Sequence, residues 1–256
     1  MGFLTDLIGD LRRRLERDPL DESGLLAIAM HLPPPRPFED ALRGTPPALI
    51  GEYKRSSPSA GAIAEPDPAS QARAYQEGGA AAISVLTEPT RFDGALADLR
   101  AIRLAAGLPV LRKDFLVHPA QVIESRAVGG DAVLLIAAAL SELELKGMLS
   151  VAADLGLGAL VETHSEEDLA KALATDAPVI GVNARDLETL DVDLERALAM
   201  LPAVPSDRIA VLESGVSTRG DVERAIDAGA RGVLVGETLM RSPDPRATIR
   251  SLRGAA

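Results

Sequence analysis

The sequence of 256 residues contains no cysteine and no tryptophan, and aromatic residues make up only 2% of it. The absence of cysteine excludes disulfides, thiolate metal sites and cysteine nucleophiles. No apolar run approaches the length that spans a membrane, and the first residues, MGFLTDLIGDLRRRLERD, are amphipathic rather than typical of a signal peptide. We therefore expect a cytoplasmic protein that does not contact a membrane.

Positive charge is also scarce, since the formal net charge is −11. This balance argues against nucleic acid as a partner, because binding to a phosphate backbone needs a basic face. An anionic small molecule would have to be bound by local groups. Only four of the 27 basic residues are lysines, namely Lys54, Lys113, Lys146 and Lys171. Lysine can lose its proton and arginine cannot, so a lysine at the end of an apolar strand is a candidate functional residue.

Short apolar runs alternate with segments of helical period along most of the chain. Several of the helical segments end in glycine just before the next apolar run, which is a common helix stop signal. The runs predict strands at 48–54, 82–88, 109–115, 132–138, 159–164, 179–185, 209–215 and 232–238.

Eight strand–helix units without a compositional break favour a closed (β/α)8 TIM barrel. An open doubly wound sheet is the alternative, but it usually carries a G-x-G-x-x-G turn, which is absent here. We expect a single domain over residues 1–256. In it, residues 1–46 form a helical extension that packs across one barrel end, and residues 47–256 form the barrel.

Charged and polar side chains stand where the expected strands end. In GEYKRSSPSAG, Glu52 and Lys54 share a face with Ile50, and such a pair beside a core is costly unless it is used. In a barrel the carboxyl ends of the strands meet at one mouth. One such charge could simply reach solvent, and mutual neutralisation remains a structural explanation for Arg185. Together they predict an active site, with Glu52, Lys54, Ser84, Lys113, Glu162, Asn183, Arg185, Glu213 and Ser214 as its candidates.

Two lysines in one cleft lower each other's pKa and carboxylates raise it, so one lysine can serve as a general acid. Glu162 follows an apolar strand, and burial is expected to raise its pKa towards an acid–base role. The three histidines, His31, His118 and His164, show no metal-ligand spacing. We expect no metal and no cofactor.

Two loops carry signals for a phosphate. The seventh and eighth expected strands end in ESGVST and VGETLM, which place Gly215 and Gly236 where backbone amides can approach a ligand closely. Loops after strands seven and eight form the usual phosphate site of such barrels. Ser57, in the SSPS segment after strand one, adds a hydroxyl on the same rim.

These motifs together resemble one known family. IGEYKRSSPSAG, VLRKDF, LVETH, IGVNARDLETLDVD, LESGVS and LVGETLM are similar, in order, to the strand-end motifs of indole-3-glycerol phosphate synthases. The resemblance runs from about Phe38 to residue 245. It implies a carboxy-lyase of tryptophan biosynthesis that closes the indole ring of 1-(2-carboxyphenylamino)-1-deoxyribulose 5-phosphate with loss of carbon dioxide and water.

The resemblance also implies roles for the residues. Lys113 is the general acid that activates the ketone, and Glu162 is the acid–base group of the later dehydration. Lys54 pairs with anionic substrate groups, Glu52 orients it, and Asn183 bonds the reacting oxygen. The other expected site residues are Arg185, Glu213 and Ser214 at the mouth, Ser57, Gly215, Gly236 and Glu237 at the phosphate, and Ser84, Leu86, Phe115, Leu134 and Leu234 around the anthranilate group.

Two positions depart from the family pattern, and other activities stay open. Gly51 stands where alanine is more frequent, and Glu237 lies where a small polar residue would repel a phosphate less.

The alternatives are a catalytically silent sugar-phosphate-binding barrel and another phosphate-binding isomerase or Schiff-base aldolase. The expected partner is an anionic sugar phosphate bearing an anthranilate group. The expected assembly is a monomer or weak homo-oligomer.

Overall fold

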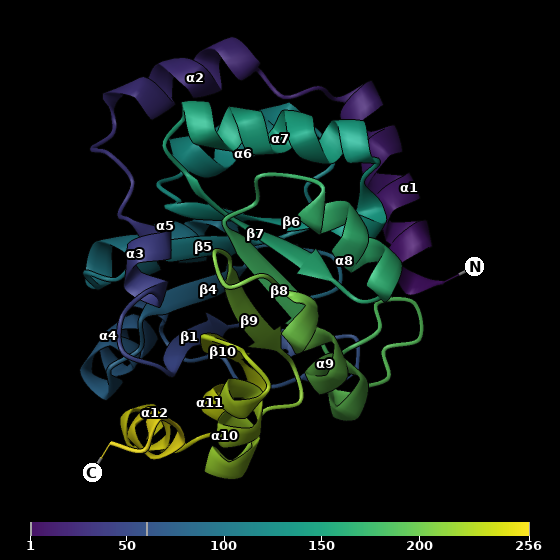
Figure 1. Cartoon of the computed structure of the whole chain (residues 1–256). Coiled ribbons are helices and arrows are strands. Elements are labelled where there is room, and N and C mark those ends of the chain that lie inside the picture. The colour runs from purple at the N-terminus through teal and green to yellow at the C-terminus, as the bar shows by residue number, and fades with distance from the viewer. Residues whose placement is uncertain (1, 60, 256) are drawn as a thin grey trace.

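The computed structural model describes residues 2–59 and 61–255, and within them eight parallel strands close into a barrel (Figure 1). The strand order is β1–β10–β9–β8–β7–β6–β5–β4, so the first and last strands are hydrogen-bonded neighbours. The (β/α)8 barrel expected from the sequence is confirmed. The barrel strands are β1 (Ala48–Tyr53), β4 (Ala82–Leu86), β5 (Val110–Lys113), β6 (Ala132–Ile136), β7 (Gly158–Thr163), β8 (Val179–Asn183), β9 (Ile209–Glu213) and β10 (Gly232–Val235).

Helices surround the barrel on its outer face (Figure 1). They are α4 (Pro68–Gly78), α5 (Leu96–Ala105), α6 (Pro119–Ala127), α7 (Glu142–Asp154), α8 (Glu166–Leu173), α9 (Leu194–Met200), α10 (Arg219–Asp227), α11 (Glu237–Met240) and α12 (Pro245–Arg253), with short 3-10 turns at Ala137–Ala139 and Leu201–Ala203. The strands are shorter at their carboxyl ends than expected, because the next residues already turn. Ala137 begins a 3-10 turn after β6, and Glu237 begins α11 after β10.

The barrel interior explains where the site lies. Alternate residues of each strand point inward, and Ile50, Leu111, Leu160 and Val211 belong to one apolar cluster that fills the barrel. A second cluster fills the space between the strands and the helices. Two residues further along each of these strands the inward-facing side chain is charged, namely Glu52, Lys113, Glu162 and Glu213.

The N-terminal extension reaches both ends of the barrel. Helix α3 (Phe38–Leu42) buries Phe38 and Leu42 completely in the interior cluster, beside the starts of the strands. Helix α2 (Glu22–His31) packs on α6, as Figure 1 shows. Helix α1 (Phe3–Arg17) lies near the mouth, where the backbone N–H of Leu4 donates to the carbonyl of Leu187. The sequence predicted that the extension packs across one barrel end. Instead, it contacts the barrel at both its base and its mouth.

The segment after β1 forms a small antiparallel hairpin of β2 (Ser56–Ser57) and β3 (Gly61–Ala62). The guanidinium of Arg55 donates to both carboxylate oxygens of Asp98 at 2.5 and 2.6 Å, which ties the hairpin to α5. This segment was expected only as a loop. In the part of the chain that the structure describes, no helix is long and apolar enough to cross a bilayer.

Candidate active site

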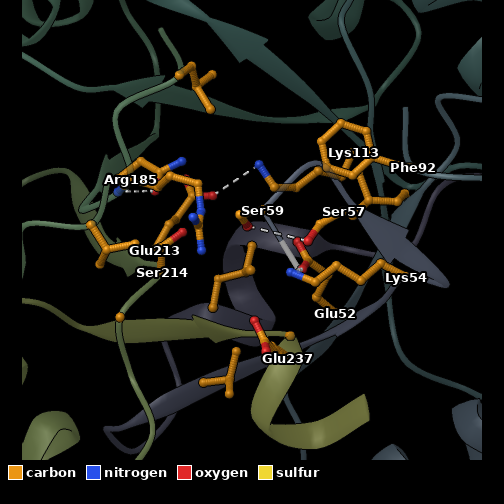
Figure 2. Close-up of a pocket in the computed structure, with 18 of the residues that line it drawn as sticks. Glu52, Lys54, Ser57, Ser59, Phe92, Lys113, Arg185, Glu213, Ser214 and Glu237 are labelled. Atoms are coloured by element: carbon orange, nitrogen blue, oxygen red, sulfur yellow. Dashed lines mark hydrogen bonds and ion pairs between the residues drawn. The ribbon is translucent and has the colours of Figure 1, made fainter. Parts of the chain in front are cut away.

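A cavity of about 430 Å³ opens at the carboxyl ends of the barrel strands. Figure 2 shows Glu52, Lys54 and Ser57 on one side of it and Arg185, Glu213 and Ser214 on the other. Of the expected residues, the cavity is lined by Glu52, Lys54, Ser57, Leu86, Lys113, Phe115, Leu134, Glu162, Asn183, Arg185, Glu213, Ser214, Gly215, Leu234, Gly236 and Glu237. Ser84 is the exception, because it lies fully buried in the barrel one layer below Leu86.

Lys113 is the centre of a buried charge cluster at the floor of the cavity. Its Nζ lies 2.6 Å from Oε2 of Glu162 and 3.3 Å from Oε2 of Glu213, and both carboxylates are at most 1% exposed. Burial alone would lower the pKa of Lys113, but the carboxylates of Glu162, Glu213 and Glu52 outweigh it and raise that pKa. Lys113 therefore remains an ammonium in the free protein.

The pKa values of the two glutamates in this cluster are shifted in opposite directions. Burial alone would raise the pKa of Glu162, but the Lys113 ammonium and the His164 ring outweigh it, and the pKa lies well below its ordinary value. Burial raises the pKa of Glu213 well above its ordinary value, since Lys113 compensates only in part and Glu162 adds a second negative charge. The sequence-based expectation of a net raised pKa for Glu162 is therefore wrong. The raised pKa belongs to Glu213, whose contact with Lys113 is longer.

Gly181 makes room for this arrangement. It lies on β8, next to Glu162 of β7 in the strand register. A side-chain carbon added there would overlap Oε1 of Glu213 and lie 2.8 Å from Cδ2 of Leu160. The missing side chain lets the Glu213 carboxylate reach across towards Lys113.

The Glu52–Lys54 pair lies on the wall of the cavity, with Nζ of Lys54 at 2.6 Å from Oε1 of Glu52. A side-chain carbon on Gly236 of the neighbouring segment would overlap Oε1 of Glu52 and lie 2.9 Å from Nζ of Lys54. On the outer face of the barrel, the hydroxyl of Tyr75 donates a hydrogen bond of 2.9 Å to the backbone carbonyl of Glu52. Gly236 thus has a role that the sequence did not indicate, which is to leave space for this ion pair.

The ends of β8 and β9 bring Asn183 and Glu213 together as register partners. Oδ1 of Asn183 accepts from the backbone N–H of Arg185 at 2.9 Å, so its NH2 group is the part left to donate into the cavity. Arg185 donates to the carbonyl of Leu190 at 2.8 Å and so stabilises the loop after β8. Ser214 has a φ of 64°, a left-handed conformation that marks a sharp backbone turn at the rim.

The expected phosphate end contains a cation that the sequence analysis did not single out. Arg241 lines the cavity, and its Nε lies 2.9 Å from Oε1 of Glu237. The acidic side chain expected to repel a phosphate is therefore paired. The spacing of four residues on one helix was the available signal, because side chains at i and i+4 are neighbours on a helix.

Aromatic residues gather at the opposite wall. Phe3, Phe92 and Phe115, three of the four phenylalanines in the sequence, line the cavity. The ring centroid of Phe115 lies 6.4 Å from that of Phe3 and 6.1 Å from that of Phe92. The sequence indicated only Phe115, because Phe3 and Phe92 lie outside the strands. This wall can bind a flat aromatic group by ring contact.

The sequence is similar to that of known proteins along almost its whole length. The family model of indole-3-glycerol phosphate synthase matches residues 8–252. The indole-3-glycerol phosphate synthase of Micrococcus luteus is 47% identical, and the match covers 100% of this chain and 98% of the relative. That of Mycobacterium avium is 51% identical, with 90% of this chain and 85% of the relative covered.

Solved structures share the fold at low sequence identity. A 3-hexulose-6-phosphate synthase superposes with a TM-score of 0.63 at 18% identity, covering 82% of this chain and 100% of that one. A thiamine phosphate pyrophosphorylase from Pyrococcus furiosus gives a TM-score of 0.62 at 18% identity, with 85% and 96% covered. These likenesses concern the barrel alone, whereas the family model and the curated relatives match almost the whole sequence. The chain belongs to the indole-3-glycerol phosphate synthase family.

Proposed function

We propose that this protein is a carboxy-lyase that converts 1-(2-carboxyphenylamino)-1-deoxyribulose 5-phosphate to indole-3-glycerol phosphate in tryptophan biosynthesis. The observation that carries the proposal is the position of Lys113. Its buried ammonium lies between two carboxylates, with an aromatic wall at one end of the cavity and Gly215 and Arg241 at the other. The aromatic wall suits the anthranilate ring of the substrate, the ammonium suits its reacting ketone, and the end with Gly215 and Arg241 suits its phosphate.

The first step is ring closure. The aromatic carbon that bears the carboxylate bonds to the ketone carbon, and the ketone oxygen takes a proton from Nζ of Lys113. Because the neighbouring carboxylates raise the pKa of Lys113, the ammonium keeps its proton until the ketone oxygen, gaining alkoxide character as the new bond forms, becomes more basic than the amine. The NH2 group of Asn183 is placed to donate to the same oxygen.

Decarboxylation and dehydration follow. The bond to the carboxylate breaks, carbon dioxide leaves, and its electron pair restores the ring. The new hydroxyl then leaves as water with one added proton, and the neighbouring methylene loses one proton. Glu162 is the acid–base group of this step, with Glu213 and Ser214 beside it. Lys54, oriented by Glu52, pairs with the anionic substrate groups.

Binding is divided between the two ends of the cavity. Phe115, Leu134 and Leu234 face the anthranilate ring, with Leu86 beside them, and Arg185 closes the mouth. Ser57, Gly215, Gly236 and Glu237 surround the phosphate, and Arg241 supplies positive charge to offset Glu237. Ser84 acts only as support from below.

We propose further that the protein acts in the cytoplasm, as a monomer or weak homo-oligomer, without binding nucleic acid. The net charge of −11 supports the last point. We also propose that residues 1–46 and the barrel of residues 47–256 form one domain. The support is that α1 brings Phe3 to the cavity while α3 buries Phe38 in the barrel interior.

The test is a fluorescence assay of indole formation from the carboxyphenylamino-deoxyribulose phosphate, with low protein background because the chain lacks tryptophan. Lys113→Ala should lower kcat by roughly 10²–10⁴, the usual contribution of a general acid. The control is Lys146→Ala, since Lys146 is exposed on α7, outside the cavity, and its ammonium pairs with Glu142 of the same helix. Substrate binding without any turnover would favour the silent sugar-phosphate-binding barrel, and no binding would contradict the substrate.

A further inference from the structure

A second cavity of about 380 Å³ lies behind the active site, between α1 and the loops after β7 and β8. It is lined by Leu4, Thr5, Ile8, Ala138, Ala139, His164, Ser165, Asp168, Asp186, Leu187, Glu188 and Arg196. Thr5 and Glu188 on its rim are exposed, so the cavity reaches solvent. Its size leaves room for several water molecules.

His164 separates this cavity from the active site. It follows β7 directly and is only 7% exposed. Its Nε2 lies 3.0 Å from Oε1 of Glu162, and its Nδ1 lies on the other side, 3.9 Å from Oδ2 of Asp168. The ring thus connects a buried glutamate of the active site to the second cavity.

The polar atoms at this junction are not satisfied by other groups. Among the described residues, neither ring nitrogen of His164 nor Oε1 of Glu162 has a well-directed hydrogen-bond partner, although Nε2 and Oε1 lie close together. Buried polar groups are normally hydrogen-bonded, and an exception calls for an explanation in terms of water or function. Both ring nitrogens are buried, so a small movement of the ring is needed to bring Nδ1 to water in the second cavity and to align Nε2 with Oε1.

The proposed reaction needs such a connection. The substrate carries a carboxylate and a phosphate, and the products are carbon dioxide, water and a phosphate ester. Each turnover therefore consumes one proton. Glu162 has no exposed surface, and bound substrate covers it from the side of the active site. The proton has to arrive from another side.

We propose that His164 is a positioning residue of this reaction, which orients Glu162 from behind and returns, through Glu162, the proton that Lys113 gives to the ketone oxygen in each turnover. This inference rests on the proposed function. A proton from water in the second cavity binds Nδ1 of the ring, and the ring gives its Nε2 proton to Oε1 of Glu162. The ring returns to its first tautomer by proton exchange with the water. Glu162 passes this proton to Nζ of Lys113, 2.6 Å from its Oε2, so the net change is the transfer of one proton from solvent to Lys113.

The groups that face His164 fit this role. They are Glu162 from β7, Asp168 from α8, Asp186 and Glu188 from the loop after β8, and Arg196 from α9. Three carboxylates and one guanidinium line the second cavity, so it favours a positive over a negative charge. Arg196 is also committed to the carbonyls of Asn183 and Ala184, each at 3.1 Å.

The test compares the steady-state kinetics of wild type with those of His164→Asn and His164→Ala between about pH 6 and pH 9. We expect both variants to be ~10- to 100-fold slower, with KM within about threefold of wild type and the deficit growing as pH rises. Added imidazole should restore part of the rate of His164→Ala, which a purely structural role would not produce. His31→Gln, at the exposed end of α2, is the control and should behave as wild type.

Each other outcome overturns the inference. An unchanged kcat in His164→Asn would exclude the relay, and so would a slow variant that imidazole does not rescue. If His164→Ala fails to fold, Asp168→Asn takes its place, because it keeps an oxygen for the backbone N–H of His164 but removes the charge beside Nδ1. It should be slower without a change in KM, and an unchanged rate would again exclude the relay. A wild-type protein that forms no indole would overturn the proposed function as well, whereas an active wild type confines the failure to His164.

Discussion

The ammonium nitrogen of Lys113 lies 2.6 Å from Oε2 of Glu162 at the floor of the cavity, where the glutamate is buried and the lysine side chain is 14% exposed. The lysine comes from β5 and the glutamate from β7, so the barrel, rather than local sequence, brings them together. Oε2 of Glu213 lies 3.3 Å from the same ammonium. The pKa of Glu213 is raised, whereas that of Glu162 is lowered. The two carboxylates are therefore chemically unequal.

This inequality predicts different effects of removing each charge. Glu162→Gln should lower kcat/KM by roughly 10²-fold or more, because it removes the ionised partner of Lys113 and the acid–base group. Glu213→Gln should cost less, about tenfold, since a neutral amide resembles the protonated carboxyl that its raised pKa favours. Steady-state kinetics at neutral pH measure both. Equal losses, or a larger loss in Glu213→Gln, would contradict the assignment.

Gly181→Ala tests the space around Glu213. The added carbon would overlap the Glu213 carboxylate and crowd Leu160, so we expect at least about a tenfold loss of kcat and a destabilisation of ~1–3 kcal/mol. Gly147→Ala is the matched control, because Gly147 is exposed in α7 and a carbon there meets no described atom within 4 Å. The control should stabilise by about 0.5–1 kcal/mol. Urea unfolding and kinetics report both effects, and wild-type activity in Gly181→Ala would contradict the prediction.

The contact between Arg12 and Glu144 predicts how the docking of α1 depends on pH. Nη1 of Arg12 lies 2.8 Å from Oε1 of Glu144, and this hydrogen bond, with those from Ser141, lowers the pKa of Glu144 to about 2. A lowered folded-state pKa means that the stabilisation is present above the ordinary value of 4.5 and is lost as pH falls towards about 2. Both side chains are more than a third exposed, so solvent screening limits it to about 0.5–1 kcal/mol.

Arg12→Gln should therefore unfold at a lower temperature than wild type at pH 7. The difference should shrink as the pH is lowered from about 4.5. Differential scanning calorimetry at several pH values measures this. Lys146→Gln is the control, since its ion pair with Glu142 is about half exposed on both sides and does not connect two helices. A difference that grows in acid would have the wrong sign.

The aromatic wall predicts a binding effect. Phe92→Ala removes a ring that lines the cavity beside Phe115, and we expect KM to rise about 3- to 10-fold while kcat changes less. Leu104→Ala, at an 88% exposed position on α5, is the control and should leave both constants unchanged. A fall in kcat alone would assign Phe92 to the chemical steps instead of to binding.

Much of this arrangement could be predicted from the sequence, for a physical reason. Apolar runs of strand length separated by helical segments specify a barrel, and a barrel brings strand ends such as Lys113, Glu162 and Glu213 to one mouth. The alternation of strand residues correctly predicted that these side chains point into the barrel, since residues two apart point the same way. Ser84 also points inward but lies below the cavity, because alternation does not say which layer of the barrel borders the cavity.

The rest depends on contacts between segments far apart in the chain. The direction of the Glu162 pKa depends on how near Lys113 and His164 come, and burial alone pointed the wrong way. Phe3 and Phe92 reach the cavity from a helix and a loop, for which strand patterns carry no information. The role of His164 could have been suspected, because it lies two residues after Glu162, but its second cavity exists only where α1 is packed.

The space that Gly236 leaves for Glu52 and Lys54 has a consequence for the order in which the protein is made. Domains fold largely as units during synthesis. The pair sits on the first barrel strand, whereas Gly236 follows the last one, which is hydrogen-bonded to the first. A nascent chain stopped before residue 232 already contains the charged side chains Glu52, Lys54, Lys113, Glu162 and Glu213 of the site. It still lacks Gly236, which leaves the space for Glu52 and Lys54. The active site is therefore complete only after the last barrel strand and Gly236 have emerged from the ribosome.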